Sequence, residues 1–265
     1  MVTADLHTHT AFSADSETSV PTMCAAALAA ALDTLAITDH FDSDVPKFQF
    51  DIPAYRAAIG KVREAFPSLR ILRGIEAGFA RGYTALLRDA VGQVDPDFLL
   101  LSCHSANGID PYFAERYFEG RTRKEGFRVY LEALLLAMEE IPDFDSLAHI
   151  GYVGRYAPPG VAATPLVYAD APDLIDEILT RLISGSHALE INTSQTAKGG
   201  APIPDADILQ RYYALGGRLL TLGSDAHRTT ALAQSFPQTA AILQRIGFTH
   251  YAVYDRRALS LRPLG

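Results

Sequence analysis

Short apolar runs alternate with amphipathic segments along most of this chain. The runs with the length and composition of buried strands are residues 2–6, 34–38, 70–75, 97–102, 146–150, 187–192, 218–223 and 250–254. Apolar residues recur at helical spacing between most of them, in segments 21–33, 51–66, 126–140, 173–184 and 205–217. Repeated strand–helix–strand order is typical of βαβ units, so the pattern predicts an α/β fold with a parallel sheet.

The spacing of these elements indicates one domain over residues 1–265. No Ser/Gly-rich linker, charge block or internal repeat interrupts the alternation. The longest irregular stretch is 105–124, which is aromatic and charged and follows an expected strand. Segments in that position often serve as lids or substrate loops. Four aromatic residues of this stretch could shape a substrate pocket or anchor the stretch to the core, and we favour anchoring. They are Tyr112, Phe113, Tyr117 and Phe118.

Composition and charge narrow the function classes. The chain of 265 residues is 48% hydrophobic and 20% charged, as expected for a globular protein. Its formal net charge of -8 argues against long nucleic acid or an anionic membrane surface as a partner, although local phosphate binding stays open. Two cysteines are too few for a disulfide framework, and the N-terminus lacks a signal-peptide pattern, so we expect a cytoplasmic protein.

Acidic and imidazole side chains stand at the carboxyl ends of seven expected strands. In chain order they are His7 and His9, Asp39 and His40, Glu76, His104, His149, Glu190 with Asn192, and Asp225 with His227. Steps between successive ends suit one βα unit each, the shortest being 28 residues (76 to 104) and the longest 45 (104 to 149). If the strands close into a barrel, all these ends meet on the face where barrel enzymes keep their chemistry.

Such a crowded cluster requires compensation. Crowded carboxylates repel one another when ionised, and so do crowded imidazoles when protonated. Divalent metal ions resolve this by binding carboxylate and neutral imidazole directly. Eight or more nitrogen and oxygen ligands exceed one coordination shell, so the pattern predicts two or three divalent ions. Zn, Fe or Mn suits a mixed histidine and carboxylate set better than Ca or Mg. Glu190 and Asn192 share one strand face, where a supporting role at the site and simple structural hydrogen bonding are equally open.

The ordered set of motifs resembles the polymerase and histidinol phosphatase (PHP) superfamily. The motifs are "HTH" at 7–9, "ITDH" at 37–40, "GIE" at 74–76, "SCH" at 102–104, "AH" at 148–149 and "GSDAH" at 223–227. They span essentially the whole chain. Within the superfamily, "HIGYVGRYAP", "ALEINTS" and "LGSDAHR" are most similar to the histidinol-phosphate phosphatases.

This resemblance implies a distorted parallel (β/α)7 barrel of the TIM-barrel-like PHP type, with a trinuclear metal centre. By matching motif, the first ion would be held by His7, His9, Glu76 and Asp225. Glu76 would bridge to a second ion, which is also held by His104 and His149. Asp15, His40 and His227 would hold the third.

The resemblance also implies a reaction. A metal-bridging hydroxide would attack the phosphorus of a small phosphomonoester, with Glu76, Asp225 and Arg155 as the catalytic residues. Arg155 would bind the phosphate as a guanidinium fork, and Lys198 is a second candidate for that contact. The implied substrate is L-histidinol phosphate, an intermediate of histidine biosynthesis, which would yield L-histidinol and phosphate.

Other readings of the same residues remain open at this point. One is a PHP phosphoesterase that acts on a nucleotide or another small phosphate. A second is a barrel without catalysis that binds metal or a partner, against which the complete ligand set argues. A third is an amidohydrolase-type enzyme, although those barrels usually bridge their metals with lysine, where this chain has Glu76.

Overall fold

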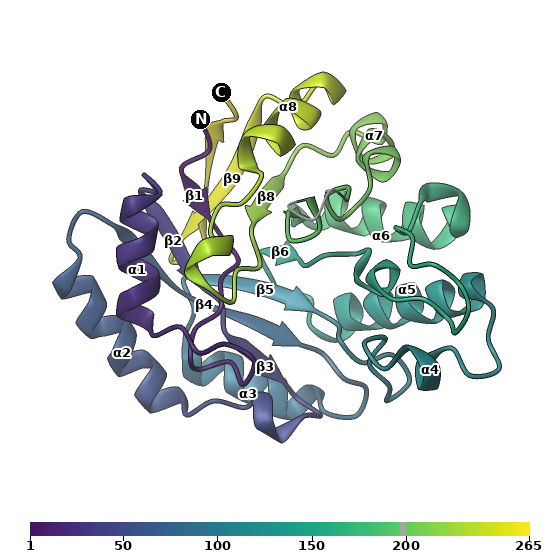
Figure 1. Ribbon diagram of the computed structural model, residues 1–265, viewed down its shortest axis with the longest axis horizontal. Helices are drawn as coiled ribbons and strands as arrows, with labels where there is room; N and C mark the ends of the chain where they lie inside the picture. Colours follow the sequence, from purple (N-terminus) through teal and green to yellow (C-terminus); the bar gives the residue numbers. More distant parts are fainter. Residues whose placement is uncertain (197–199) are drawn as a thin grey trace.

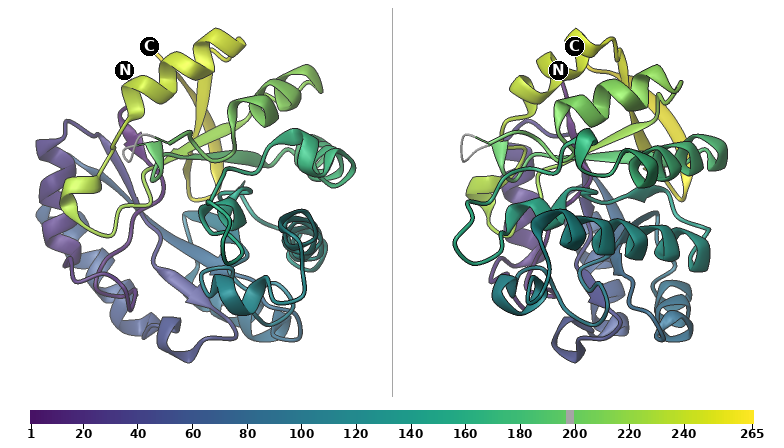
Figure 2. Two further views of the ribbon diagram at one scale, coloured as in Figure 1. Left: turned by 45° about the vertical axis from the view of Figure 1, so that its right-hand side comes forward. Right: turned by 90° about the vertical axis from the view of Figure 1, so that its right-hand side faces the viewer.

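The computed structural model describes residues 1–196 and 200–265 and forms a nearly closed parallel barrel wrapped by helices (Figures 1 and 2). The barrel strands are β1 (Ala4–Asp5), β2 (Thr34–Ile37), β3 (His40–Asp42), β4 (Arg70–Gly78), β5 (Phe98–Ser102), β6 (Ser146–Leu147), β7 (Ala188–Asn192) and β8 (Leu220–Gly223). Their path runs β1-β2-β4-β5-β6-β7-β8. Strand β2 pairs with the amino-terminal half of β4, and β3 continues its line along the carboxyl-terminal end of β4. The expected (β/α)7 barrel is therefore confirmed.

Backbone hydrogen bonds between the two ends of this path close the barrel. The amide of Leu6 donates to the carbonyl of Leu222 at 3.0 Å, and the amide of Asp225 donates to the carbonyl of His7 at 2.8 Å. Further along, the amide of His9 donates to the carbonyl of Ala226 at 2.9 Å. These bonds fix the segments after β1 and β8 side by side, which places two of the strand-end motifs next to each other.

The outer layer consists of helices, several of which begin at recognisable capping residues. The long helices are α1 (Val20–Ala29), α2 (Ile52–Ala65), α3 (Thr84–Val94), α5 (Arg123–Glu140), α6 (Pro172–Gly185), α7 (Ala206–Ala214) and α8 (Phe236–Ile246). Ser19 and Asp51 cap α1 and α2, and Thr122 and Glu125 form a capping box at the start of α5. The capping box starts α5 three residues before the expected segment 126–140.

Several elements were not expected from the sequence pattern. They are helices α3 and α8, the short α4 (Ala114–Tyr117), the 3-10 turns η1 (Pro46–Phe48), η2 (Tyr152–Arg155), η3 (Tyr168–Asp170) and η5 (Thr229–Ala231), and strands β3 and β10 (Ala258–Pro263). Helix α4 lies inside the stretch 105–124 that was expected to be irregular. Tyr117 and Phe118 are buried there and hold the segment to the core, whereas Tyr112 and Phe113 are exposed.

The last expected strand does not join the barrel. Strand β9 (His250–Asp255) pairs antiparallel with β10, and this hairpin contacts residues that precede three barrel strands. The Tyr254 hydroxyl donates to the carbonyl of Asp145, the Arg257 amide donates to the carbonyl of Asp97, and the Thr3 amide donates to the Tyr251 hydroxyl. The hairpin therefore covers the amino ends of the strands and leaves the carboxyl ends open.

The strands are buried along almost their full length, as parallel barrel strands are. All residues of β5 are buried, and so are Leu35, Ile37, Ile75 and Ile191 on other barrel strands. Within residues 1–196 and 200–265, no helix is both long and apolar enough to cross a bilayer.

One buried tyrosine ties a helix to two neighbouring strands. The hydroxyl of Tyr55, on α2, lies 2.7 Å from the carbonyl of Ile37 and 2.8 Å from that of Gly74. We expect Tyr55→Phe to lower the free energy of unfolding by about 1–3 kcal/mol, because buried carbonyls would lose their donor. Urea unfolding measures this effect. The matched control is Tyr83→Phe at an exposed side chain, which should change stability by less than about 0.5 kcal/mol; equal effects of the two variants would contradict the prediction.

Candidate metal centre

The barrel brings the nine predicted metal ligands into one cluster at the carboxyl ends of its strands. His7 and His9 follow β1, His40 begins β3 and Glu76 lies within β4. The remaining predicted ligands come from the segments after β1, β5, β6 and β8, and they are Asp15, His104, His149, Asp225 and His227. Each lies within 4 Å of another member of the set.

Four donor atoms converge in the first group. Oε2 of Glu76 lies 3.3 Å from Nε2 of His7 and 3.6 Å from Nε2 of His9. Oδ1 of Asp225 lies 3.7 Å and 3.4 Å from the same two nitrogens. Donors around one tetrahedral ion at a typical ligand distance of about 2.1 Å are ~3.4 Å apart, so these separations suit a shared ion.

The second oxygen of Glu76 faces another pair of histidines. Oε1 lies 2.8 Å from Nε2 of His149 and 3.2 Å from Nε2 of His104. The two oxygens of one carboxylate therefore point at two different sets of imidazoles. This arrangement is the one a carboxylate bridging two ions would need.

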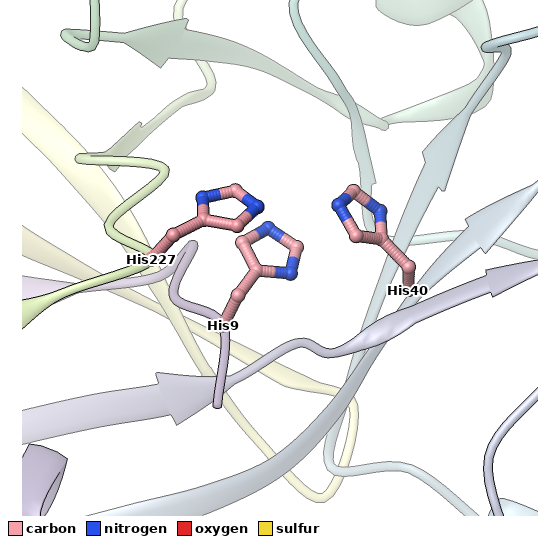
Figure 3. A group of neighbouring side chains, drawn as sticks. All are labelled: His9, His40 and His227. Carbon is pink, nitrogen blue, oxygen red and sulfur yellow. The ribbon is translucent and has the colours of Figure 1, made fainter. Parts of the chain in front are cut away.

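The third group consists of Asp15, His40 and His227, and its two histidines lie beside His9 (Figure 3). The ring of His9 stacks on those of His40 and His227, with centroid distances of 4.1 and 4.2 Å. Oδ2 of Asp15 lies 3.2 Å from Nε2 of His227 and 3.7 Å from Nε2 of His40. The Asp15 side chain is 46% exposed, so this group is the most open of the three.

Buried polar atoms in the cluster lack hydrogen-bond partners. Nε2 of His7, Nε2 of His9 and Oε2 of Glu76 are enclosed atoms without one. Buried polar atoms are almost always satisfied, so these three require another explanation. They are the atoms that converge in the first group, and together with the second pair of histidines they fit more than one metal ion.

Burial and mutual charge shift the ionisation of the cluster in opposite directions. Burial alone acts to raise the pKa of Glu76, but the charges of His104, His40 and His7 hold it well below its usual range. Burial acts to lower the pKa of His7, and the charges of Glu190 and Glu76 outweigh it and raise that pKa well above normal. The pKa of His9 is held well below its usual value by burial and by the charges of its histidine neighbours. The cluster thus supplies both anionic oxygens and a neutral imidazole, which suits divalent cations.

Three further carboxylates hold the histidines in place. Glu190, on β7, accepts hydrogen bonds from Nδ1 of His7 at 2.5 Å and from the His149 amide at 2.8 Å. Asp42, on β3, lies 2.9 Å from Nδ1 of His104. Asp39 accepts a hydrogen bond from the Ser13 hydroxyl, which lies 3.2 Å from Nδ1 of His9. Such contacts fix ring orientation in metal sites.

Of these carboxylates, sequence reasoning missed Asp42. It shares a strand face with His40, two residues earlier, and that alternation was the available signal. Glu190 had been left between a supporting role and a structural one; it contacts two of the predicted ligands.

Backbone features at β8 bring these groups together. A Cβ on Gly223 would meet Oε1 of Glu190 and Cβ of His7 at 2.4 Å, so only glycine fits there. Asp225 has a φ of 56°, a left-handed conformation that is strained for a residue with a Cβ. Such strain is often retained at functional sites, where the surrounding contacts hold it.

Arg155 lies at the edge of the cluster on η2. One of its terminal nitrogens, Nη2, donates to Asp225 Oδ2 at 2.9 Å, to Asn192 Oδ1 at 3.1 Å and to Ser194 Oγ at 2.7 Å. Its Nε is buried without a hydrogen-bond partner, which leaves a donor available for an anion. Lys198, the other predicted phosphate contact, lies outside the described residues.

We expect chelation of bound metal to lower the melting temperature by about 10 °C, because a ligand that binds only the folded state stabilises it. Differential scanning calorimetry on protein of known metal content, before and after dialysis against a chelator, measures the shift. Re-addition of Zn should restore the original value. An unchanged melting temperature after complete metal loss would contradict a buried metal centre.

We expect Glu190→Gln to weaken metal affinity by about 10- to 100-fold, because the amide is a poorer acceptor for Nδ1 of His7. Competition with a chromophoric chelator measures the affinity. Glu177→Gln, at an exposed residue of α6, is the matched control. If both variants bind metal like the parent protein, Glu190 has no supporting role.

Comparison with known proteins agrees with this geometry. Residues 5–194 match the model of the PHP domain family. The chain is 32% identical to a probable histidinol-phosphatase of Clostridium acetobutylicum, over 88% of this chain and 89% of that protein. It is 30% identical to a probable histidinol-phosphatase of Thermotoga maritima, over 97% and 98% of the two chains.

A solved structure is similar over nearly the whole length. It is histidinol phosphate phosphatase from Lactococcus lactis subsp. lactis, complexed with Zn, L-histidinol and phosphate. The TM-score is 0.87 at 27% identity, and the match covers 97% of this chain and 98% of that one. The family match, the full-length relatives and the ordered cluster of histidines and carboxylates lead to one conclusion: this chain belongs to the PHP family.

Proposed function

We propose that this protein is a histidinol-phosphatase, which hydrolyses L-histidinol phosphate to L-histidinol and phosphate and so serves histidine biosynthesis. The proposal rests on the position of the Glu76 carboxylate. Its two oxygens face two sets of histidines, as a phosphatase with several ions requires, in a chain that aligns over nearly its full length with histidinol-phosphatases.

The ligand sets of the proposed ions follow the three groups. His7, His9, Glu76 and Asp225 would hold one ion, and Glu76, His104 and His149 a second. Asp15, His40 and His227 would hold a third at the open side. Zn, Fe or Mn suits this mixture of imidazole and carboxylate. When bound, such ions lower the pKa of water and neutralise charge on a phosphoryl group.

The protein's own residues orient the substrate and the ligands. Arg155 is the phosphate-binding residue in this proposal, because its unpartnered Nε provides a donor beside Asp225. Glu190 holds the ring of His7 through Nδ1, which directs Nε2 toward Glu76 and Asp225. Asn192 donates to Asp225 Oδ2 at 3.2 Å and so fixes that carboxylate. Lys198 remains a predicted second phosphate contact.

Two broader features complete the proposal. We infer that residues 1–265 work as a single domain, because the terminal hairpin packs on the same barrel that carries the cluster. We also place the reaction in the cytoplasm, which is supported by two free buried thiols, Cys24 and Cys103.

The test is phosphate release from L-histidinol phosphate beside a panel of mononucleotides and sugar phosphates, with protein of measured metal content. We expect kcat/KM for histidinol phosphate to exceed every panel member by at least about 100-fold, since the leaving group adds binding contacts. A higher rate on a nucleotide would overturn the substrate and keep the metal chemistry. No hydrolysis by fully metallated protein would overturn the enzyme assignment.

Arg155→Lys and Asp225→Asn separate phosphate binding from metal binding. We expect Arg155→Lys to lower kcat/KM about 100-fold with metal content retained, because lysine cannot reproduce the guanidinium fork. Asp225→Asn should lower both activity and metal content. Arg128→Lys, in a surface ion pair with Asp173, is the matched control and should leave both unchanged. Full activity of Arg155→Lys would remove Arg155 from the proposed site.

A further inference from the structure

The segment after β5 places an acidic side chain beside the metal centre without making it part of the predicted ligand set. This residue is Asp110, which is half-buried. We propose that Asp110 binds the ammonium group of the substrate's amino alcohol and thereby selects L-histidinol phosphate over phosphate esters that lack an amine. The inference rests on the proposed function and names a specificity residue for it.

One tyrosine connects Asp110 to the cluster. The hydroxyl of Tyr152 donates to Oδ1 of Asp110 at 3.0 Å. The ring of the same tyrosine lies 5.2 Å from that of His104 and 5.3 Å from that of His149, centroid to centroid. The guanidinium carbon of Arg155 lies 5.3 Å from the Tyr152 ring centre. A single side chain therefore separates Asp110 from two predicted metal ligands and from the proposed phosphate-binding residue.

The Asp110 carboxylate is held in a fixed orientation. Oδ1 accepts two hydrogen bonds, from the Tyr152 hydroxyl and from the backbone amide of Tyr112 at 2.8 Å. Both donors use the same oxygen. Within residues 1–196 and 200–265, Oδ2 accepts no hydrogen bond, and the carboxylate forms no ion pair with lysine or arginine. A second oxygen is thus left to receive a donor from outside the chain.

The surroundings favour a cation at this position. Burial raises the pKa of Asp110, and the charge of His104 opposes that shift. A half-buried carboxylate without a cationic partner is costly, and a bound ammonium group supplies both charge and hydrogen bonds. The ring of Tyr112, whose backbone amide donates to Asp110, lies 5.7 Å from the ring of Tyr156, centroid to centroid.

The chemistry of the substrate matches this placement. In L-histidinol phosphate the ammonium group sits on the carbon next to the ester methylene, so it stays close to the phosphate. A phosphate held at Arg155 and the metal centre would bring that ammonium to the neighbouring residues of the site. The Asp110 carboxylate binds Tyr152 and the Tyr112 amide and forms no hydrogen bond or ion pair with a predicted metal ligand within residues 1–196 and 200–265, so it is free to bind this ammonium group.

The test compares two substrates in two proteins. The substrates are L-histidinol phosphate and imidazolylpropyl phosphate, the analogue without the amino group. We expect the parent protein to prefer the aminated substrate by about 10- to 100-fold in kcat/KM, because a hydrogen bond between charged groups contributes a factor of this size. In Asp110→Asn, which keeps an acceptor for Tyr152, this ratio should fall toward one. Glu115→Gln, an exposed acid in the same segment, is the control and should keep the parent ratio.

Two further measurements separate binding from a structural role. Tyr152→Phe removes one hydrogen bond to Asp110 and keeps the carboxylate, so it should retain preference for the aminated substrate. Inhibition of the parent protein by L-histidinol should exceed that by imidazolylpropanol about tenfold or more, which needs no variant to fold.

Each outcome has one meaning. Equal losses on both substrates in Asp110→Asn, or an unchanged ratio, would overturn the role of Asp110. A lost ratio in Tyr152→Phe with an intact one in Asp110→Asn would assign the selection to the tyrosine and also overturn it. If the parent protein shows no preference for L-histidinol phosphate over the mononucleotide panel, the proposed function fails first, and the two failures remain distinguishable.

Discussion

The carboxylate of Glu76 is the group on which the rest of this centre depends. It is fully buried near the carboxyl end of a barrel strand, where an isolated anion would be very costly. Imidazoles approach it from two sides: His7, His9 and His40 lie at one oxygen, and His104 and His149 lie at the other. Shared cations satisfy such an arrangement better than hydrogen bonds do, because the nitrogens that face Glu76 from His7 and His9 have no hydrogen-bond partners.

The barrel supplies the rigidity that this carboxylate requires. Parallel strands bring their carboxyl ends to one face, and the bonds after β1 and β8 hold the two most distant motifs together. Glu190 contacts one residue from each of two predicted metal groups, since it binds both the His7 ring and the His149 amide. Movement of β7 would therefore disturb both groups. The packing of the barrel strands therefore determines the geometry of the centre.

Strand-end chemistry was predictable from the sequence because alternation and βα spacing determine where polar residues must meet. Eight of the nine predicted ligands lie together for that reason, whereas Asp15 was predicted from the family resemblance; their roles as ligands stay a prediction. Asp42 was missed because the apolar strand pattern ends at Thr38 and does not reveal that the chain resumes as β3 at His40. Asp110 was missed because its place depends on a contact with Tyr152, 42 residues away.

Two of the elements that the sequence pattern did not predict, α3 and β10, have weak sequence signals. Helix α3 begins at Thr84, its N-cap residue Tyr83 forms no side-chain capping bond, and the helix contains Gly92, so its sequence signal is weak. Strand β10 is exposed on most of its residues and lacks the apolar pattern of a barrel strand. The hairpin it forms is defined by long-range contacts, among them the ion pair of Arg262 with Asp33. Sequence periodicity carries no information about such pairings.

That hairpin has a consequence for how the molecule is made. Residues 250–263 emerge from the ribosome after every barrel strand, yet they contact the residues that precede β1, β5 and β6. During synthesis, the amino ends of the strands are therefore open to water until the final hairpin arrives. Covering the amino end of the barrel is a late, non-local event, and a growing chain that stalls before this point exposes apolar surface to the cell's chaperones.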